Sequence, residues 1–287
     1  MRHDEKRRRA TQIKKVNTMR NSRIGTGETA LITGASSGIG EALAGCFARN
    51  GFDLVLVARS ADKLAALAGK LVAKHKIKVQ VQPADLSKPG SAKKLAAAIK
   101  RRKQSVDILV NNAGVLEHGR FAAMTPERHQ QLIDLNVSGL TAMLANFVPP
   151  MVARGHGRIL NVASIAAFQP IPTLATYAAT KAYVLSLTES LSEELKGSGV
   201  SITALCPGIT ATNMLSTAAG TSGKLAKLPG FLIGDVDKVA KEGYDACING
   251  EVIKVPGAIN HAAILAGRAT PKWLLRKFSG ALGRKSI

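Results

Sequence analysis

The segment TALITGASSGIG, residues 29–40, contains the pattern that decides the fold of the chain. Its first five residues form a short apolar run that is typical of a buried strand. Three glycines, Gly34, Gly38 and Gly40, then form a turn, and the Ala-rich stretch to about Asn50 predicts a helix. A strand, a glycine-rich turn and a helix in this order are typical of the first unit of a nucleotide-binding α/β domain.

The rest of the chain repeats the alternation of strand and helix. Further strands are predicted at 53–58, 77–83, 106–114, 158–163, 200–208 and 251–257. Helices are predicted after the second strand to about His75, over 87–102, over 125–154 and from about 173–175 onward. Strands that are apolar on both faces specify a parallel sheet covered by helices on both sides. The predicted fold class is therefore α/β, a doubly wound Rossmann-type parallel sheet of about seven strands in a single domain, residues 28–257.

Two basic segments flank this domain. Residues 1–27 lack periodicity and are expected to form a disordered arm, with nine Lys and Arg against two acids in residues 1–24. Residues 258–287 form a C-terminal tail, whose last twenty residues carry six Lys and Arg and no acid. These two stretches hold +13 of the net charge of +21, so the middle of the chain is only moderately basic. Such charge favours anionic partners or simply solubility.

The stretch 269–287 predicts a basic amphipathic helix, with an apolar stripe made by Trp273, Leu274, Leu275 and Phe278. Such a helix packs on the protein or lies on an anionic membrane surface, and the sequence leaves both alternatives open. Residues 209–250 are rich in Gly, Thr and Lys before becoming helical again, which predicts a lid over a site. Its apolar side chains favour an apolar substrate, and they are Met214, Leu215, Leu225, Leu228, Phe231 and Leu232.

Three cysteines, Cys46, Cys206 and Cys247, are widely spaced in apolar surroundings. They indicate buried, reduced thiols of a cytoplasmic protein, because a disulfide framework needs an even, regular set. The histidines show no ligand spacing, so no metal site is predicted. No apolar run reaches the roughly 18–20 residues that span a bilayer, and the charged N-terminus argues against a secretory signal.

The glycine turn is suited to hold a pyrophosphate. Gly34 can adopt a backbone conformation closed to other residues, and Gly38 and Gly40 allow phosphate to approach the start of the following helix. Ser36 and Ser37 add hydroxyl and backbone donors. A tight turn without a ligand is the alternative interpretation, and the position in the first strand–turn–helix unit favours nucleotide binding.

The end of the second strand indicates which dinucleotide is bound. NAD needs an acid there to accept hydrogen bonds from the adenosine ribose, and the chain has Ala58 followed by Arg59. The Arg59 guanidinium suits a 2′-phosphate, so NADP(H) is the expected cofactor.

A third group of residues can move a proton. Ser164 follows the apolar strand 158–163, while Tyr177 and Lys181 lie four residues apart on a predicted helix and so share one face. A hydroxyl at a strand end facing a Tyr–Lys pair could transfer a proton to or from a carbonyl oxygen. Each residue taken alone has an ordinary structural explanation.

These segments together resemble the short-chain dehydrogenase/reductase family, over about residues 28–257. The family's pattern TGxxxGIG matches Thr33, Gly34, Ala35, Ser36, Ser37, Gly38, Ile39 and Gly40, and its NNAG element matches Asn111, Asn112, Ala113 and Gly114. The YxxxK pair matches Tyr177 and Lys181, with the family serine at Ser164 and the asparagine of the central helix at Asn136. The pair Asp85 and Leu86 resembles the adenine contact, and Pro207 and Gly208 resemble the turn beside the nicotinamide.

The resemblance implies a role for each catalytic residue. Tyr177 would be the general acid in reduction and the general base in oxidation. Lys181 would lower the Tyr177 pKa and hold the nicotinamide ribose, Ser164 would hold the substrate oxygen, and Asn136 would orient a proton-relaying water.

The sequence therefore predicts an NADP(H)-dependent oxidoreductase that acts on a carbonyl or secondary alcohol, with an apolar or acyl-type ketone expected. The resemblance implies a homodimer or homotetramer built on the long helices after the fourth and fifth strands. The alternative is a nucleotide-binding sensor or scaffold whose basic tails contact membrane or nucleic acid. Nucleic acid is disfavoured, because no basic stretch is interleaved with aromatic residues.

Overall fold

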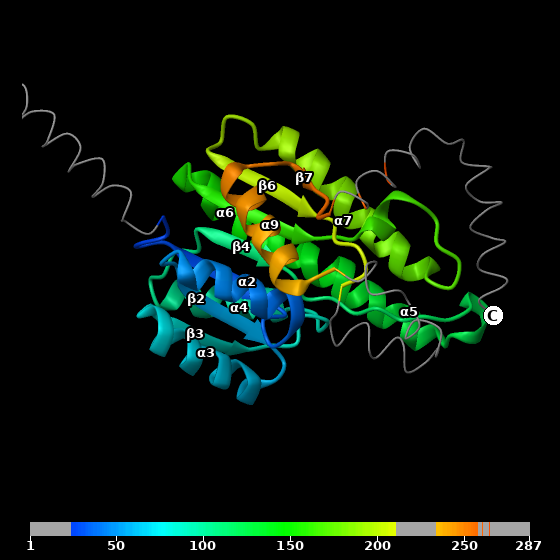
Figure 1. Ribbon diagram of the computed structural model, residues 1–287, viewed down its shortest axis with the longest axis horizontal. Coiled ribbons are helices and arrows are strands. Elements are labelled where there is room, and N and C mark those ends of the chain that lie inside the picture. Colours follow the sequence, from blue (N-terminus) through cyan, green and yellow to red (C-terminus); the bar gives the residue numbers. More distant parts are fainter. Residues whose placement is uncertain (1–23, 211–233, 258–259, 261–263, 265–287) are drawn as a thin grey trace, which may run out of the picture.

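A single parallel sheet is the centre of the molecule in the computed structural model, which describes residues 24–210, 234–257, 260 and 264. The strand order is β3-β2-β1-β4-β5-β6-β7, as Figure 1 shows. The strands are β1 (Thr29–Thr33), β2 (Asp53–Ala58), β3 (Val79–Pro83), β4 (Ile108–Asn111), β5 (Gly157–Val162), β6 (Val200–Leu205) and β7 (Ile253–Lys254). The predicted doubly wound fold is confirmed.

The strand β1 lies at the middle of the sheet and is buried along its whole length. On one side Leu31 pairs in register with Val55 of β2, and on the other with Leu109 of β4. Strand order changes direction between β1 and β4, because the chain first builds outward to β3 and then returns. In doubly wound sheets a crevice opens at the carboxyl ends of the strands at this point.

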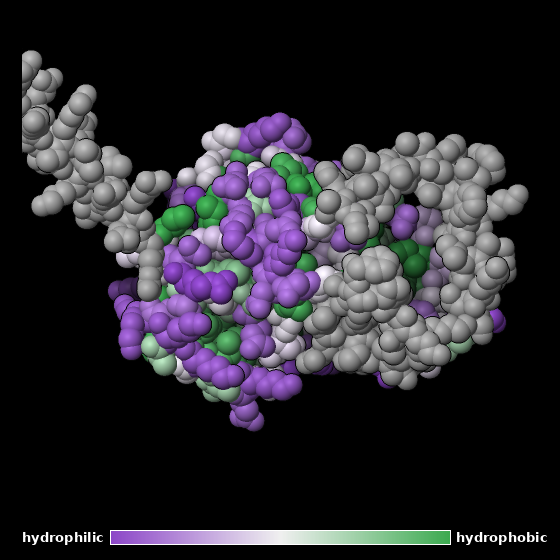
Figure 2. All heavy atoms as spheres, in the orientation of Figure 1, coloured by the Kyte–Doolittle hydropathy of each residue, from purple (hydrophilic) through white to green (hydrophobic). Residues whose placement is uncertain are grey.

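Helices cover both faces of the sheet. They are α2 (Gly38–Arg49), α3 (Ala61–His75), α4 (Ser91–Arg101), α5 (Pro126–Ile133), α6 (Leu140–Arg154), α7 (Ala175–Glu194) and α9 (Val236–Asn249), with short helical turns η1 (Phe121–Ala123) and η3 (Ile165–Phe168). Buried side chains of α2, α3 and α9 pack on one face, and those of α4, α6 and α7 on the other. Hydrophilic side chains cover much of the outer surface around α2, α3 and α9 in Figure 2.

The helix predicted over 125–154 is continuous but irregular. Between α5 and α6 the segment η2 (Asp134–Gly139) is a π-helix, a conformation frequently found at functional sites. Gly139 has no Cβ, and one added there would lie 2.5 Å from the Leu86 carbonyl oxygen. The span Pro126–Arg154 is also long and apolar enough to cross a membrane by length and composition alone. Its buried residues, such as Met143 and Phe147, belong to the core on one face of the sheet.

Segment boundaries differ in part from the sequence-based expectation. Residues 24–27, assigned to the arm, form a turn whose Gly25 N–H donates to the Asn50 carbonyl. The second half of the predicted lid, 236–249, is α9, which packs on α2. Residues 1–23, 211–233 and most of the tail, including 269–287, lie outside the described residues. The three cysteines are buried and form no disulfide with one another.

Candidate active site

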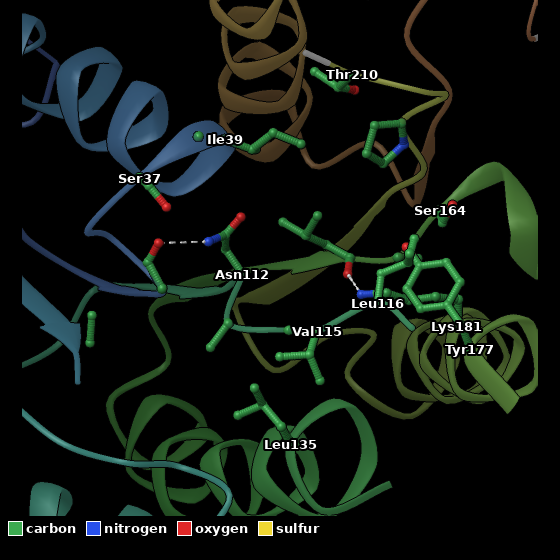
Figure 3. A pocket seen from close by; sticks show the side chains of 18 of the residues that line it. Ser37, Ile39, Asn112, Val115, Leu116, Leu135, Ser164, Tyr177, Lys181 and Thr210 are labelled. Carbon is green, nitrogen blue, oxygen red and sulfur yellow. Dashed lines mark hydrogen bonds between the residues drawn. The ribbon is translucent and has the colours of Figure 1, made fainter. Parts of the chain in front are cut away.

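A cavity of about 830 Å³ opens at the carboxyl ends of the strands, beside the point where strand order reverses. One end is formed by the glycine turn and the ends of β2 and β3, and the other by Ser164, Tyr177 and Lys181 (Figure 3). All the cofactor residues predicted from the sequence line this cavity except Gly40. They are Gly34, Ser36, Ser37, Gly38, Ile39, Arg59, Asp85, Leu86, Asn112, Ala113, Gly114, Tyr177, Lys181, Pro207 and Gly208.

The glycine turn packs tightly on the strand next to it. The Asn112 side-chain amide donates to the carbonyl oxygens of Thr33 (3.0 Å) and Gly34 (3.2 Å). A Cβ on Gly40 would lie 2.3 Å from the Gly34 carbonyl oxygen and 2.4 Å from Asn112 Nδ2. Gly40 therefore does not line the cavity and instead allows α2 to start close to β1. Gly34 and Gly38 have positive φ angles of 64° and 59°, which only glycine adopts without strain.

The start of α2 presents unused donors to the cavity. Ser37 is the N-cap of α2, but its side chain makes no capping hydrogen bond. In Figure 3 its side chain points from the start of α2 toward the side on which Asn112 lies. The first backbone N–H groups of a helix have no partner within the helix and favour an anion. This end of the cavity therefore fits a pyrophosphate.

Two cations stand at the mouth of the cavity beyond β2. Arg59 follows β2, and Lys63 lies in the first turn of α3, so both line the same pocket and are exposed. Neither forms an ion pair with another described residue within 4.0 Å. Beside them, the Asp85 carboxylate accepts hydrogen bonds from the Ser87 hydroxyl (2.6 Å) and N–H (3.0 Å). The Ser87 hydroxyl is the main cause of the lowered pKa of Asp85.

The residues Ser164, Tyr177 and Lys181 meet at the opposite end of the cavity. Ser164 precedes η3, and its hydroxyl accepts from the Ala166 N–H at 3.1 Å. Lys181 Nζ donates to the Val162 carbonyl at 2.8 Å and lies 5.8 Å from the centre of the Tyr177 ring. Tyr177 and Lys181 are 8% and 6% exposed. The strand end and the helix thus bring together the three residues that the sequence grouped.

Burial dominates the protonation of this group. It raises the pKa of Tyr177, an effect that the Ser164 hydroxyl only partly offsets. Burial also lowers the pKa of Lys181, to about 8. The lowered pKa that the family resemblance implies for Tyr177 also involves the bound oxidised nicotinamide, and it stays a prediction. Burial disfavours the phenolate, and the phenol is the form that donates a proton to a carbonyl oxygen.

Asn136 lies in the π-helical segment η2 and is 1% exposed. Its Oδ1 accepts from the Val115 N–H (2.9 Å), and its Nδ2 donates to the Val115 carbonyl (2.9 Å) and the Thr180 hydroxyl (3.1 Å). Both donors of the side chain are therefore used. A Cβ on Gly114 would lie 3.2 Å from Asn136 Oδ1 and 3.5 Å from Lys181 Nζ, so the three residues are immediate neighbours. The side chain joins the loop after β4 to α7.

Aliphatic side chains also line the cavity that contains the Ser–Tyr–Lys group. They are Val115, Leu116, Leu135, Ile165, Ile171 and Leu174. Two hydrogen bonds, which we call the clasp, join the loop that carries Val115 and Leu116 to the loop that carries Ile171 and Leu174. In this clasp His118 Nε2 lies 2.9 Å from the Thr173 hydroxyl, and the Gly119 N–H donates to the Thr173 carbonyl at 2.9 Å. Thr173 has a φ of 68°, an unfavourable conformation for a β-branched residue.

Sequence reasoning missed Lys63 and this apolar wall. The position of Lys63, four residues after Arg59 and at the start of a predicted helix, is a signal that was available. The wall residues come from separate loops and short helical segments, and no pattern in the sequence marks them. Among the described residues, no group of three His, Cys, Asp or Glu could hold a metal ion.

Comparisons with known proteins identify the family. Residues 28–222 match the family model described as short chain dehydrogenase. The chain is 41% identical over 202 residues to the oxidoreductase UcpA of Escherichia coli K12, covering 69% of this chain and 74% of UcpA. The chain belongs to the short-chain dehydrogenase/reductase family.

Solved structures agree with this family assignment. A short-chain dehydrogenase from Sphingobium yanoikuyae in complex with NADPH has a TM-score of 0.75 at 36% identity, covering 84% of this chain and 93% of that chain. The bulky-bulky ketone specific alcohol dehydrogenase from Comamonas testosteroni has a TM-score of 0.71 at 30% identity, covering 84% and 92%. The Ser–Tyr–Lys group of this short-chain dehydrogenase therefore lies in a fold shared with oxidoreductases.

Proposed function

We propose that this short-chain dehydrogenase is an NADP(H)-dependent carbonyl reductase that acts on apolar ketones. The observation that carries the proposal is that one cavity contains both the glycine turn and the Ser–Tyr–Lys group. A protonated, buried Tyr177 stands beside Ser164 and Lys181 at one end, and a glycine turn with two unpaired cations lies at the other. A dinucleotide bound at the turn would reach the tyrosine without leaving the cavity.

The residues present fit NADP(H) better than NAD(H). The turn from Gly34 to Gly40 and the open N-terminus of α2 would hold the pyrophosphate. Arg59 and Lys63 would hold the 2′-phosphate, since β2 ends in Ala58 and supplies no acid for a free 2′-hydroxyl. The relative from Sphingobium yanoikuyae binds NADPH. The bound cofactor supplies the hydride, and the protein supplies position and protons.

The remaining predicted contacts are assigned as follows. Asp85, held in place by Ser87, and Leu86 would border the adenine. Asn112, Ala113, Gly114, Pro207 and Gly208 would border the ribose and nicotinamide. A Cβ on Gly208 would lie 2.6 Å from the Asn260 side-chain amide nitrogen, so the Asn260 side chain would have to move.

Proton transfer falls to this chain's own residues. The Tyr177 phenol would donate its proton to the carbonyl oxygen as the ketone is reduced, and the Ser164 hydroxyl would donate a hydrogen bond to the same oxygen. Lys181 would carry the replacement proton, because its pKa of about 8 lies near the pH of the cell. The Asn136 side chain would hold Val115 and Thr180 in place around Lys181. Both side-chain donors of Asn136 are used, so a water that relays protons from Lys181 would bind the main-chain carbonyl of the π-helical segment η2.

The wall around the proton donor favours an apolar ketone. Six aliphatic side chains line the same cavity as the Ser–Tyr–Lys group and offer no partner to a charged substrate. Val115, Leu116 and Ile171 pack against the cluster that contains Tyr177. The relative from Comamonas testosteroni is specific for bulky ketones. An aliphatic or acyl-type ketone with apolar groups on both sides of the carbonyl is the expected substrate class.

A panel of ketones of increasing size, assayed by NADPH oxidation, tests this function. Tyr177→Phe should lower kcat by about 10²–10⁴ while leaving NADPH binding intact. Tyr183→Phe is the matched control, because Tyr183 lies on the outer side of α7 and its hydroxyl pairs with Thr141 at 2.8 Å. An unchanged rate in Tyr177→Phe would contradict the mechanism. NADPH binding without turnover of any ketone would favour the nucleotide-binding sensor or scaffold.

We also propose that the protein is a homodimer or homotetramer. Ile133, Val152 and Tyr183 are large apolar side chains between 37% and 40% exposed, and they lie on α5, α6 and α7. A second copy covering these helices would bury them, which is favourable by about 25 cal/mol per Å² of apolar surface. Analytical ultracentrifugation of the wild type and of Val152→Glu measures the assembly, and the variant should shift it toward the monomer.

A further inference from the structure

The Lys and Arg residues of the described chain are concentrated in one segment. Residues 59–103, which run from the end of β2 through α3, β3 and α4, contain thirteen Lys and Arg against Asp62 and Asp85, a formal charge of +11. The other main described segments, 24–58, 104–210 and 234–257, contain ten Lys and Arg against fifteen Asp and Glu, a formal charge of −5. The fold is therefore strongly polarised.

The cations of residues 59–103 all face solvent. Each of the thirteen is exposed, and none forms an ion pair with another described residue, whereas the seven ion pairs of the described residues lie elsewhere. They are Arg59, Lys63, Lys70, Lys74, Lys76, Lys78, Lys88, Lys93, Lys94, Lys100, Arg101, Arg102 and Lys103. We call this set the basic face.

The basic face lies on the part of the molecule formed by β2, β3 and the helices that follow them. β3 is the last strand on its side of the sheet, and α3 packs beside it on one face. On the other face α4 packs against side chains of β1, β2 and β4 (Figure 1). On α3, Lys63, Lys70 and Lys74 are spaced by seven and four residues and so follow one side of the helix. Figure 2 shows hydrophilic side chains over this margin of the molecule.

The basic face is continuous with the cofactor cavity. Arg59 and Lys63 belong both to the face and to the cavity wall. Lys70 and Lys74 lie outside the cavity, roughly 10 and 16 Å along α3 from Lys63 at 1.5 Å per residue. At about 0.1 M salt the Debye length is about 10 Å, so these lysines act on an approaching anion without touching the bound one.

The chemistry of the face fits a small anion better than a nucleic acid or a bilayer. Val72 is the one exposed large apolar side chain in residues 59–103, and no aromatic residue occurs there. Stacking of bases needs aromatic side chains, and anchoring in a bilayer is stronger with apolar ones. NADP(H) carries a 2′-phosphate and a pyrophosphate, about −4 in total, and NAD(H) about −2.

We propose that the basic face steers NADP(H) electrostatically into the cavity and favours it over NAD(H) in the rate of association. This inference rests on the proposed cofactor. Steering by a charged surface raises association rates by about 10–10³ and falls steeply with ionic strength. Binding contacts at Arg59 and Lys63 then decide how long the cofactor stays, whereas the distant lysines act only on its arrival.

Stopped-flow measurement of NADPH and NADH association from low to high salt tests the proposal. The wild-type rate for NADPH should fall with salt about twice as steeply as that for NADH, as their charges require. Lys70→Glu/Lys74→Glu should slow NADPH association several-fold at low salt, with no loss at high salt and an unchanged dissociation rate. Lys196→Glu/Lys241→Glu changes the net charge equally on α9 and beyond α7, and should have little effect.

Several outcomes would overturn the proposal. If both double variants slowed NADPH association equally, the effect would come from the net charge of the protein and not from the basic face. A loss that persists at high salt, or a faster dissociation, would place Lys70 and Lys74 in direct contact or in the fold. The variant Lys70→Gln/Lys74→Gln should give about half the effect of the glutamates. Turnover at saturating NADPH should be unchanged, so failure of steering is distinguishable from a chain that binds no NADPH at all.

Discussion

The two ends of the cavity recognise their ligands by different means. The cofactor end consists of a glycine turn, an uncapped helix start and the cations Arg59 and Lys63. The carbonyl end consists of aliphatic side chains around one proton donor, Tyr177. Phosphate recognition needs donors and charges at fixed positions, whereas an apolar wall needs only a suitable volume and shape.

This difference explains why the cofactor end could be predicted from the sequence and the aliphatic wall of the carbonyl end could not. Any other residue at position 40 would place its Cβ 2.3 Å from the Gly34 carbonyl oxygen, so the glycine of this turn is required and is visible in the sequence pattern. Ile171 and Leu174 could be exchanged for other aliphatic residues with a change in selectivity only. The cofactor end should therefore respond to mutation by large losses, and the carbonyl end by altered preference.

The largest expected effect is at the glycine turn. Gly40→Ala places a methyl group against the Gly34 carbonyl and the Asn112 amide, and should destabilise the protein by about 3 kcal/mol. Gly45→Ala is the matched control in the same helix, because a Cβ there meets nothing within 4 Å. It should stabilise by about 1 kcal/mol. Urea unfolding of both variants checks the prediction, and equal stability would show that the turn can move.

The next effect concerns charge at the cofactor end. Arg59→Ala should cost NADPH binding about 2–3 kcal/mol, roughly 30- to 150-fold, because a charge-assisted hydrogen bond is lost. NADH binding should change little. Lys63→Ala should act in the same direction with a smaller loss. Dissociation constants for both cofactors, measured by fluorescence titration, give the comparison, and equal losses for NADPH and NADH would exclude Arg59 as the phosphate ligand.

The sheet and the Ser–Tyr–Lys group could be predicted because their signals are local. An apolar run such as β1 and the four-residue spacing of Tyr177 and Lys181 are visible in a short window. The rise that burial causes in the pKa of Tyr177 could not be predicted, since burial depends on the packing of other elements around the side chain. The same holds for Asn136, whose partners Val115 and Thr180 come from other elements.

The charge distribution could be predicted from the sequence only in part. The sequence alone gives the charge of residues 59–103, but a count over the middle of the chain conceals it, because the remainder of the fold is acidic. Only the fold shows that Lys63, Lys70 and Lys74 follow one side of α3, which packs beside the edge strand β3. Their continuity with Arg59 follows from the cavity, not from the spacing.

Lys181, beside Tyr177 at the carbonyl end of the cavity, gives a prediction for the dependence of stability on pH. Its pKa is about 8 in the fold, below the ordinary 10.5. The unfolded chain therefore binds more protons between these values, and stability rises with pH across this window. Below it both states are protonated and the cost of burying the charge is fully present. Between about pH 7.5 and about pH 9.5 the gain should be about 2 kcal/mol.

Urea unfolding of the cofactor-free wild type and of Lys181→Met at the two pH values isolates this contribution. Other titrating groups, including Tyr177, are present in both proteins, so the difference between them belongs to Lys181. A parallel dependence in the two proteins would mean that the lysine is not buried as a charge.

The smallest effect is expected at the carbonyl end. Ile171 lines the cavity and packs against the cluster of Leu132, Ala166, Tyr177 and Ala178. Ile171→Ala enlarges the wall, and should cost a small apolar ketone about 1 kcal/mol in kcat/KM, roughly fivefold, while favouring a bulkier one. NADPH affinity should be unchanged, because the side chain lies at the opposite end from Arg59. Val252→Ala, an exposed aliphatic truncation outside the cavity, is the control. An equal loss for small and bulky ketones would mean that Ile171 supports Tyr177 and does not shape the substrate space.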